Sequence, residues 1–367
     1  MRRVPSGWLI GTVALILLIL IPVATSVFGL SAEVFTVLPT EVFIFAIFAL
    51  TYDLIFGFTG LISFGQALFV GGGAYALAIA MSEHGASLWE AVLVTVAAGI
   101  CLSVATGLLA LRTRGVYFAM ITLAFAEAAY TLAQSNIGNI TGGANGLPLT
   151  GVPSWVISPS TQNNLYYIAL SFLVLSFLVL KLFVSSPAGK VWPAIRDNEQ
   201  RAMMIGYRPY LYKLMAYVIA GTICSLAGAL YAIYIGFVST EDLSVDITIQ
   251  LLLMVIIGGA GSLWGAIVGA AILRYLNYYL GQLSTSSAVT HLPPSLQQTV
   301  GQPLLILGVI YLLLIYFFPQ GIAGLVQRYF NSTQTPVPIG LNNVESGLEE
   351  TSLTETGVPI VETPQGG

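Results

Sequence analysis

The residues that could best do chemistry lie in a short charged segment between two long apolar stretches. Residues 190–213 hold five of the twelve Lys and Arg residues of the chain, together with Asp197, Asn198 and Glu199. Charged and hydrogen-bonding side chains at this density can recognise a complementary surface on another molecule. The basic residues of the segment are Lys190, Arg196, Arg201, Arg208 and Lys213.

Capping signals predict one short helix inside this segment. Asp197 can accept hydrogen bonds from the free amides of a first helical turn, and Gln200 follows at the spacing of a capping box. Gly206 favours the left-handed conformation that ends many helices, and Pro209 prevents continuation. A helix of about two turns is marginal in water, so its apolar residues 202–205 need a surface on which to pack. We expect that surface to belong to a partner protein.

Three ionisable residues lie within or beside apolar runs, where charge is costly and often functional. Asp53 stands near Gly57 at the inner end of its run, which favours a role at the cytoplasmic interface. Glu127 lies in the middle of its run and should face either a bundle interior or an aqueous cavity, so it is the better pathway candidate. Arg274 can extend its stem toward an interface.

Residues 60–67 and 259–266 are similar glycine-rich segments within apolar runs. Paired segments of this kind are typical of duplicated transporter folds, in which broken helices lie near a translocation pathway. Close packing of helices through small residues is the alternative, and both interpretations can hold together. We predict an internal pseudo-repeat and a pathway that works by alternating access. The predicted pathway residues are Gly60, Ser63, Gln66, Glu127, Gly259, Gly261 and Ser262.

The sequence lacks common signatures of catalysis and nucleotide binding. The phosphate-binding pattern G-x-x-x-x-G-K-[ST], the zinc helix HExxH and the nucleophile elbow G-x-S-x-G are all absent. Cys101 and Cys224 lie in apolar runs, so we expect buried small side chains rather than a disulfide or a zinc site. We therefore predict a chain that is not an enzyme and binds no cofactor. If ATP supplies energy, another chain must hydrolyse it.

The composition requires a membrane environment. Of the 367 residues, 56% are hydrophobic and only 8% are charged, whereas soluble domains carry about 25% charged residues. The apolar runs are long and continuous, as membrane-crossing helices of about 20 residues require, and they lack the alternation of barrel strands. These observations predict an all-α polytopic membrane protein. The runs lie near residues 8–28, 41–56, 61–81, 88–111, 116–134, 166–184, 210–237, 250–280 and 302–318.

Basic residues set the expected orientation, because Lys and Arg in short loops stay on the cytoplasmic side. Residues 135–164 contain neither Lys nor Arg and are therefore placed outside. The first apolar run follows two arginines as a signal peptide would, but it is long and lacks a clear cleavage site, so we expect a retained helix. The cytoplasmic side is predicted to hold Arg2, Arg3, Arg112, Arg114 and residues 190–213.

One apolar run must be divided into two crossings if the C-terminal end of the chain is to lie on the cytoplasmic side. We predict that residues 250–280 break at 258–262 into a short inward helix and a return helix from about Gly265. The chain then has about ten transmembrane helices, within a range of eight to ten, and both termini are cytoplasmic. We assign residues 1–330 to the transmembrane domain. Residues 331–367 are acidic, lack basic residues and are expected to be disordered.

Six segments, in order, resemble the M-type inner-membrane permeases of branched-chain amino acid ABC importers, and the resemblance spans roughly residues 40–325. The polar loops among these segments make the resemblance specific, because apolar composition alone would not reproduce them. The segments are residues 51–67, 111–119, 122–127, 141–147, 194–199 and 251–265.

This resemblance implies a cell-membrane importer with two permease chains, two cytosolic subunits that bind ATP, and an extracytoplasmic solute-binding protein. It implies a ten-helix permease bundle in contact with lipid and an amino acid substrate, and no nucleic acid partner. Residues 186–209 match the coupling loop that contacts the ATPase, although Gln200 and Arg201 depart from the family pattern. The implied coupling residues are Asp197, Asn198, Glu199, Arg201, Ala202 and Gly206.

The resemblance predicts the substrate less closely than it predicts the architecture. Leucine, isoleucine and valine are the main substrates of the family, but relatives import other amino acids, urea or short amides, and the binding protein usually sets selectivity. An ion-coupled secondary carrier is the alternative from another class, and it would function without an ATPase. Co-purification with an ATP-binding protein distinguishes these two classes.

Overall fold

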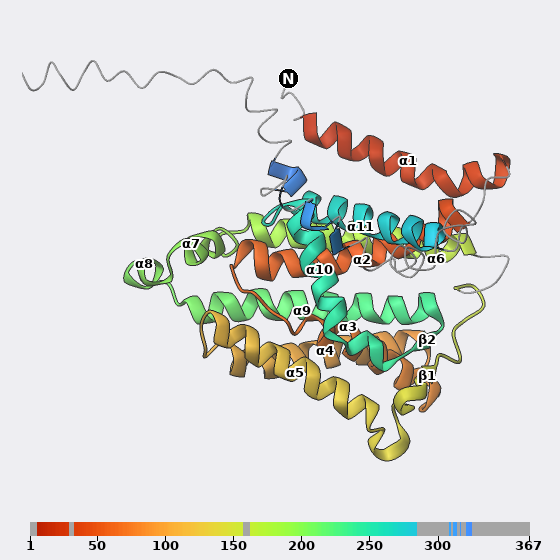
Figure 1. The fold of residues 1–367 in the computed structure, drawn as a ribbon, viewed down its shortest axis with the longest axis horizontal. Helices are drawn as coiled ribbons and strands as arrows, with labels where there is room; N and C mark the ends of the chain where they lie inside the picture. The colour runs from red at the N-terminus through yellow and green to blue at the C-terminus, as the bar shows by residue number, and fades with distance from the viewer. Residues whose placement is uncertain are drawn as a thin grey trace, which may run out of the picture. The chain divides into compact units, whose positions relative to one another are not determined.

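The computed structural model describes residues 6–28, 33–156, 162–284, 308–309, 311–313, 316 and 321–324. Within these ranges the chain is a bundle of apolar helices (Figure 1). The helices are α1 Ser6–Phe28, α2 Leu38–Asp53, α3 Gln66–Ser82, α4 Leu88–Ala110, α5 Val116–Gln134, α6 Gln162–Ser185, α7 Val191–Asp197, α8 Glu199–Met204, α9 Pro209–Ile235, α10 Val245–Gly258 and α11 Leu263–Ser284. Two short strands, β1 Leu147–Pro148 and β2 Phe237–Val238, pair antiparallel.

Helix α2 lies at the centre of the bundle. Every residue of α2 except Glu41 is buried. It contacts α6, α9, α10 and α11, as Figure 1 illustrates. A helix that is apolar all round can be buried on every side, which explains this position. The π-helical segment Leu54–Phe58 continues α2 to the point where the chain leaves the helix.

Small residues allow α3, α4 and α9 to pack closely. A Cβ added at Gly73 would overlap the Ser225 backbone, and one added at Gly228 would overlap the Val70 backbone. Close approach of backbones through small residues is the usual way in which membrane helices associate. Close packing through small residues therefore occurs in this part of the bundle, at glycines outside the two predicted segments.

The predicted break in residues 250–280 is confirmed. Helix α10 ends at Gly258, α11 begins at Leu263, and the two helices are bent by 118°. Gly258 and Gly265 lie so close that a Cβ on either would overlap the carbonyl of the other. Both the bend and the tight pairing therefore depend on small residues.

The predicted helix over residues 61–81 is shorter in the structure. Residues 59–65 are outside any helix, and α3 begins only at Gln66. Gly60 has φ +72°, a left-handed conformation that favours glycine and ends the preceding helix. Most of the first glycine segment is thus a non-helical break before α3 and does not belong to that helix.

In the described part of the chain, five helical segments are long and apolar enough to cross a membrane, and the bent α10–α11 pair could add a sixth. At 17 residues, α3 is shorter than these five. The predicted run 302–318 and the tail 331–367 lie wholly or mostly outside the described residues. The count of ten helices and the orientation of the termini stay predictions. The five segments are residues 34–58, 88–110, 116–134, 163–185 and 209–235.

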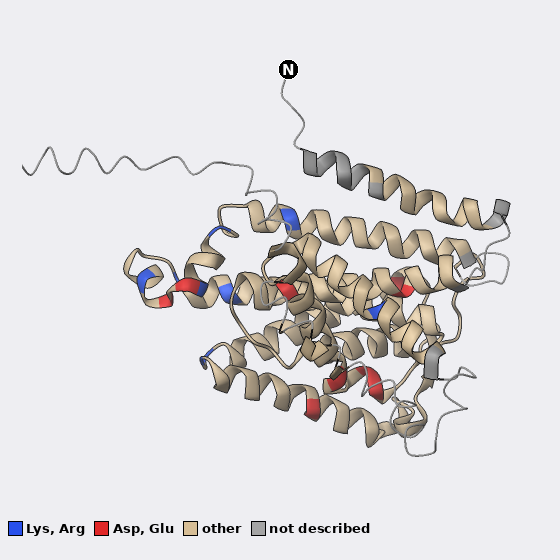
Figure 2. Ribbon diagram, turned by 45° about the horizontal axis from the view of Figure 1, so that its top comes forward, with Lys and Arg blue, Asp and Glu red and all other residues tan. Residues whose placement is uncertain are grey.

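Charge is sparse along the described helices and is concentrated where α7 and α8 lie (Figure 2). One cysteine prediction is wrong. Cys224 is buried as expected, but Cys101 is exposed on α4. The buried side of α4 is a stripe of small residues that includes Ala91, Gly99, Ser103 and Gly107, and Cys101 lies off this stripe.

Candidate functional site

The charged segment forms two short helices, α7 and α8, where one was predicted. Asp197 is the last residue of α7, and Asn198 has the extended backbone that separates the helices, with φ −158° and ψ 100°. Asn198 Oδ1 accepts a hydrogen bond from the Arg201 amide at 2.9 Å and so caps α8. The predicted Asp197 cap with Gln200 as its capping-box partner is therefore wrong by one residue. Both residue types cap well, so only the backbone bend decides between them.

The predicted C-terminal stop of this segment is confirmed. Gly206 has φ +97°. Its amide donates to the Met203 carbonyl at 2.9 Å, and the Tyr207 amide donates to the Ala202 carbonyl at 3.1 Å. This pair of bonds is the Schellman arrangement, which satisfies the last carbonyls of a helix. Pro209 then occupies the first turn of α9.

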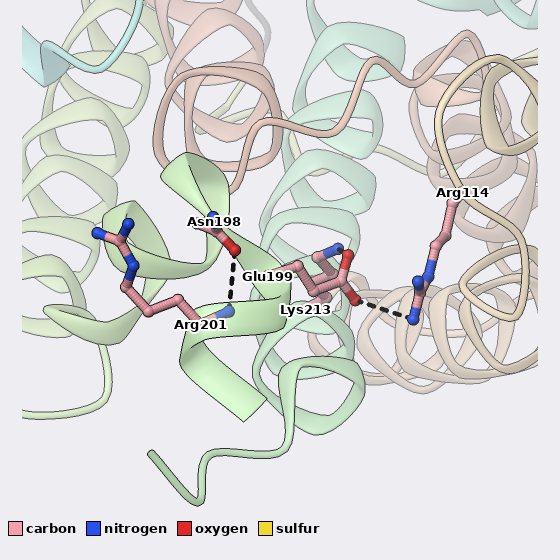
Figure 3. A network of polar contacts seen from close by, with 5 residues as sticks. All are labelled: Arg114, Asn198, Glu199, Arg201 and Lys213. Carbon is pink, nitrogen blue, oxygen red and sulfur yellow. Dashed lines mark hydrogen bonds and ion pairs between the residues drawn. The ribbon is translucent and has the colours of Figure 1, made fainter. Parts of the chain in front are cut away.

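Glu199 connects α8 to two neighbouring segments. Figure 3 shows its carboxylate between Lys213 on α9 and Arg114 before α5. The Lys213 Nζ lies 2.9 Å from Glu199 Oε2, and the Arg114 Nη2 lies 3.9 Å from Oε1. The Lys213 side chain is 13% exposed, so this contact is shielded from water more than an ordinary surface pair. Arg201 contributes its backbone amide to the cap, while its side chain points away from Glu199.

A small apolar cluster holds the two helices to the start of α9. Val191, Ile195 and Ala202 are buried together against Tyr212. Trp192 is fully buried, and its Nε1 donates to the Tyr212 carbonyl at 3.0 Å. We call residues 191–206 the coupling block, because these contacts join α7 and α8 into one unit. Ala202 therefore faces inward, although it is among the implied coupling residues.

The tip of the coupling block is apolar and uncovered by the described chain. Met204 is 81% exposed and Ile205 is 70% exposed. Burying side chains of this size is favourable by about 1.5 to 3 kcal/mol each. An exposed apolar tip beside charged residues is the pattern expected of a docking surface.

The structure brings the second predicted glycine segment against Asp53 and Gly57, which lie just before the first segment. The Gly261 amide donates to Asp53 Oδ1 at 2.7 Å, and the backbones of Gly57 and Gly261 are in direct contact. The Arg196 Nη1 of α7 donates to the Gly57 carbonyl, and its stem packs on Gly60. We call Asp53, Gly57, Gly60 and Gly261 the glycine junction. Gly60 and Gly261 are predicted site residues, whereas Arg196 is predicted only as one of the basic residues of the charged segment and is not among the implied coupling residues.

Ser63, Gln66 and Ser262 also form hydrogen bonds, although the Gln66 Oε1 atom is buried without a hydrogen-bond partner among the described residues. Ser63 and Gln66 are fully buried. The Ser63 carbonyl accepts from the Tyr52 hydroxyl at 3.1 Å, and the Gln66 Nε2 donates to Thr51 Oγ1 at 3.2 Å. In the second segment Gly259 is buried, and the Ser262 hydroxyl accepts from the Gly265 amide at 3.3 Å. Their role in a pathway stays a prediction.

Glu127 is exposed on α5 and does not face the interior of this subunit. Of the two predicted environments, the bundle interior is therefore wrong for this chain. The neighbouring Thr122 faces inward instead, and its Oγ1 accepts from the Phe64 amide at 3.1 Å. Thus α5 supports the first glycine segment through Thr122, while Glu127 lies on another face.

Comparison with known proteins identifies the family. Residues 34–317 match the family described as the permease component of branched-chain amino acid transport systems. The chain is 30% identical over 262 residues to the high-affinity branched-chain amino acid transport permease LivM of Salmonella typhimurium and to that of Escherichia coli. Each match covers 64% of this chain and 60% of the relative. The chain thus spans less than two thirds of the length of these curated relatives.

More distant relatives extend the comparison. A probable LivM of Methanocaldococcus jannaschii is 25% identical over 213 residues, covering 56% of this chain and 59% of the relative. An autoinducer 2 import permease, LsrC of Photorhabdus laumondii, is 29% identical over 101 residues, covering 26% of this chain and 30% of the relative. No solved structure matches the chain. Because the family match covers most of the apolar core, the chain belongs to the family of branched-chain amino acid transport permeases.

Proposed function

We propose that this chain is a permease subunit of an ATP-driven importer that moves branched-chain amino acids across the cytoplasmic membrane. The observation that supports this most is the coupling block, a capped and anchored unit whose apolar tip is uncovered on a chain without a phosphate-binding motif. Such a unit suits the transfer of movement from a separate ATPase, because its two helices are fixed to each other and to α9.

The proposed complex contains a second permease chain, two cytosolic ATP-binding subunits and an extracytoplasmic solute-binding protein. ATP binds to the partner subunits, and this chain carries no catalytic residue. The basic residues of the coupling block favour a cytoplasmic position, which places both termini of a ten-helix chain inside. Transport proceeds by alternating access, with the substrate pathway opening to one side at a time.

A matched pair of substitutions tests the docking surface. Ile205→Asp places a charge on the tip of the coupling block, whereas Ile137→Asp changes a residue of similar exposure, 68% against 70%, after α5. We expect Ile205→Asp to release the ATP-binding subunits during co-purification and Ile137→Asp to retain them. Retention by both variants would contradict the assigned docking surface.

Uptake into vesicles tests the transport function. The complete complex should take up leucine only with ATP, and isoleucine and valine should compete while urea and acetamide should not. Competition by urea or acetamide would instead indicate an amide permease. Uptake driven by an imposed ion gradient without ATP would indicate a secondary carrier and overturn the proposal.

A further inference from the structure

We propose that Arg196 is a positioning residue that transmits movement of the coupling block to both glycine segments of the permease. This inference rests on the proposed function, since it assumes that an ATPase moves the block. It assigns to one side chain the connection between a docking surface and two separate breaks in the transmembrane helices.

Arg196 leaves the coupling block and contacts the first glycine segment directly. Its Nη1 donates to the Gly57 carbonyl. A Cβ added at Gly60 would meet the Arg196 stem, with Cγ the closest atom. The chain leaves the helix after Phe58, so carbonyls near this end need partners from outside it. Arg196 supplies one of these partners from a residue 139 positions away.

The same side chain borders the second glycine segment. A Cβ added at Gly261 would lie 3.6 Å from Arg196 Nη1 and 3.4 Å from the Gly57 carbonyl oxygen. The guanidinium therefore sits where the two breaks meet. Among the hydrogen bonds of the described residues, that of Arg196 is the one that joins the coupling block to this junction.

The buried carboxyl group of Asp53 lies at the same junction as the Arg196 guanidinium. The Asp53 side chain is fully buried, and its Oδ1 accepts from the Gly261 amide. Arg196 bonds to the Gly57 carbonyl, and Gly57 lies against Asp53 Oδ1, so the guanidinium belongs to the same junction. The ion pair of Arg196 is with Asp197, whose Oδ1 lies 3.6 Å from Arg196 Nε. A buried carboxylate needs hydrogen bonds, because their loss leaves it poorly solvated. Displacing Arg196 therefore disturbs Gly57 and, through it, the contact between Asp53 and Gly261.

The base of Arg196 is rigid enough to transmit displacement. Trp192 precedes it by one helical turn, and its hydrogen bond to Tyr212 fixes α7 to α9. Ile195 packs with Ala202 of α8. A movement imposed on the tip of α8 is thus carried to Arg196 through packed side chains. Glycines on both sides of the junction then allow the attached helices to change angle.

Coupling ratios in the reconstituted complex test this role. We would measure substrate molecules taken up per ATP hydrolysed for the wild type, Arg196→Gln and Arg196→Lys. Arg196→Gln keeps a hydrogen-bond donor but loses the charge, and we expect the ratio to fall about tenfold while the complex assembles. Arg196→Lys keeps the charge without the planar fork, so we expect a smaller fall of about threefold. Arg112→Gln, at an exposed arginine outside the coupling block, is the control and should retain the wild-type ratio.

A double substitution tests the link to Asp53. Asp53→Asn keeps an oxygen acceptor for the Gly261 amide and removes the negative charge. If the two residues act as a unit, Asp53→Asn with Arg196→Gln should lower the ratio no further than either change alone. If the fold-losses of the two single substitutions multiply in the double substitution, Asp53 and Arg196 act independently and the proposed link between them is overturned.

The outcomes separate this inference from the proposed function. A wild-type ratio in an assembled Arg196→Gln complex would overturn the role of Arg196 and leave the importer function intact. If Arg196→Gln does not assemble, Arg196→Lys decides in the same way: a lowered ratio supports the role and an unchanged one overturns it. Absence of ATP-driven uptake in the wild type would overturn the proposed function and this inference together.

Discussion

Glu41 at the start of α2 and Arg274 within α11 form an ion pair inside the helix bundle. Their side chains are only 18% and 17% exposed. The Arg274 guanidinium also lies over the Phe45 ring, 4.0 Å from the ring centroid. Arg274 therefore pairs with a carboxylate and an aromatic face, and its extension toward an interface stays a prediction.

Breaking this pair should destabilise the protein. Arg274→Met leaves the Glu41 carboxylate without its partner, and because the pair is only partly buried we expect a loss below the about 3 to 5 kcal/mol of a fully buried pair. The double substitution Glu41→Leu with Arg274→Met removes both charges and should restore most of this loss. The midpoint of thermal unfolding of the purified protein measures both effects.

The control for this measurement is Arg112→Met, which removes an exposed arginine and should leave the unfolding midpoint nearly unchanged. Equal losses at positions 112 and 274 would contradict a structural role for the pair.

The corrected cap of α8 gives a second prediction. Asn198→Ala removes the oxygen that accepts from the Arg201 amide and should destabilise α8 by about 1 kcal/mol. Asn198→Asp keeps the acceptor and should retain the helix. Hydrogen exchange at residues 199–204 should accelerate in the alanine variant only. Asp197→Ala is the matched control. Faster exchange of residues 199–204 in this variant would mean that Asp197 caps the helix, as predicted from the sequence.

The parts of this fold that could be predicted depend on local chemistry. Long apolar runs predict helices because the bilayer leaves backbone groups no other partners. The break at 258–262 is visible because three glycines interrupt such a run, and the Gly206 stop is visible because a proline follows it closely. Each of these signals is complete within a few residues of the chain.

The contacts that could not be predicted join distant parts of the sequence. Asp53 meets Gly261 across 208 positions, and Arg196 meets Gly57 across 139. The exposure of Glu127 was also not predicted, although small residues such as Ala119, Thr122 and Ala126 mark the buried face of α5 and Glu127 lies off that face. At the cap, two adjacent residues are both good caps, so only the bend between helices selects Asn198.

Charge reversal at Glu199 should uncouple transport. Glu199→Lys places a cation beside Lys213 and Arg114, where like charges repel. The exchange Glu199→Lys with Lys213→Glu restores an opposite pair and should recover part of the uptake. Uptake of leucine by vesicles, normalised to inserted protein, measures both variants. If Glu199→Lys alone took up leucine at the wild-type rate, Glu199 would not be needed for coupling.

Thiol labelling should place the two ends of the bundle on opposite sides of the membrane. The background carries Cys101→Ser and Cys224→Ala, and single changes Ile140→Cys and Met204→Cys introduce exposed test positions. An impermeant reagent should label position 140 from outside and position 204 from inside. Gln334→Cys tests the helix count: labelling from inside agrees with ten crossings, and labelling from outside with nine.

Added bulk at the glycine junction should block transport. A Cβ at Gly57 would overlap Asp53 Oδ1 and the Gly261 amide nitrogen, neither of which can move without loosening the junction. A Cβ at Gly281 of α11 would meet nothing within 4 Å, so this glycine provides the matched control. We expect Gly57→Ala to lower leucine uptake at least about tenfold and Gly281→Ala to change it little. Binding of leucine to the isolated binding protein, measured separately, distinguishes blocked passage from lost recognition. Equal uptake by the two variants would mean that close contact between Gly57 and Gly261 is not needed for transport.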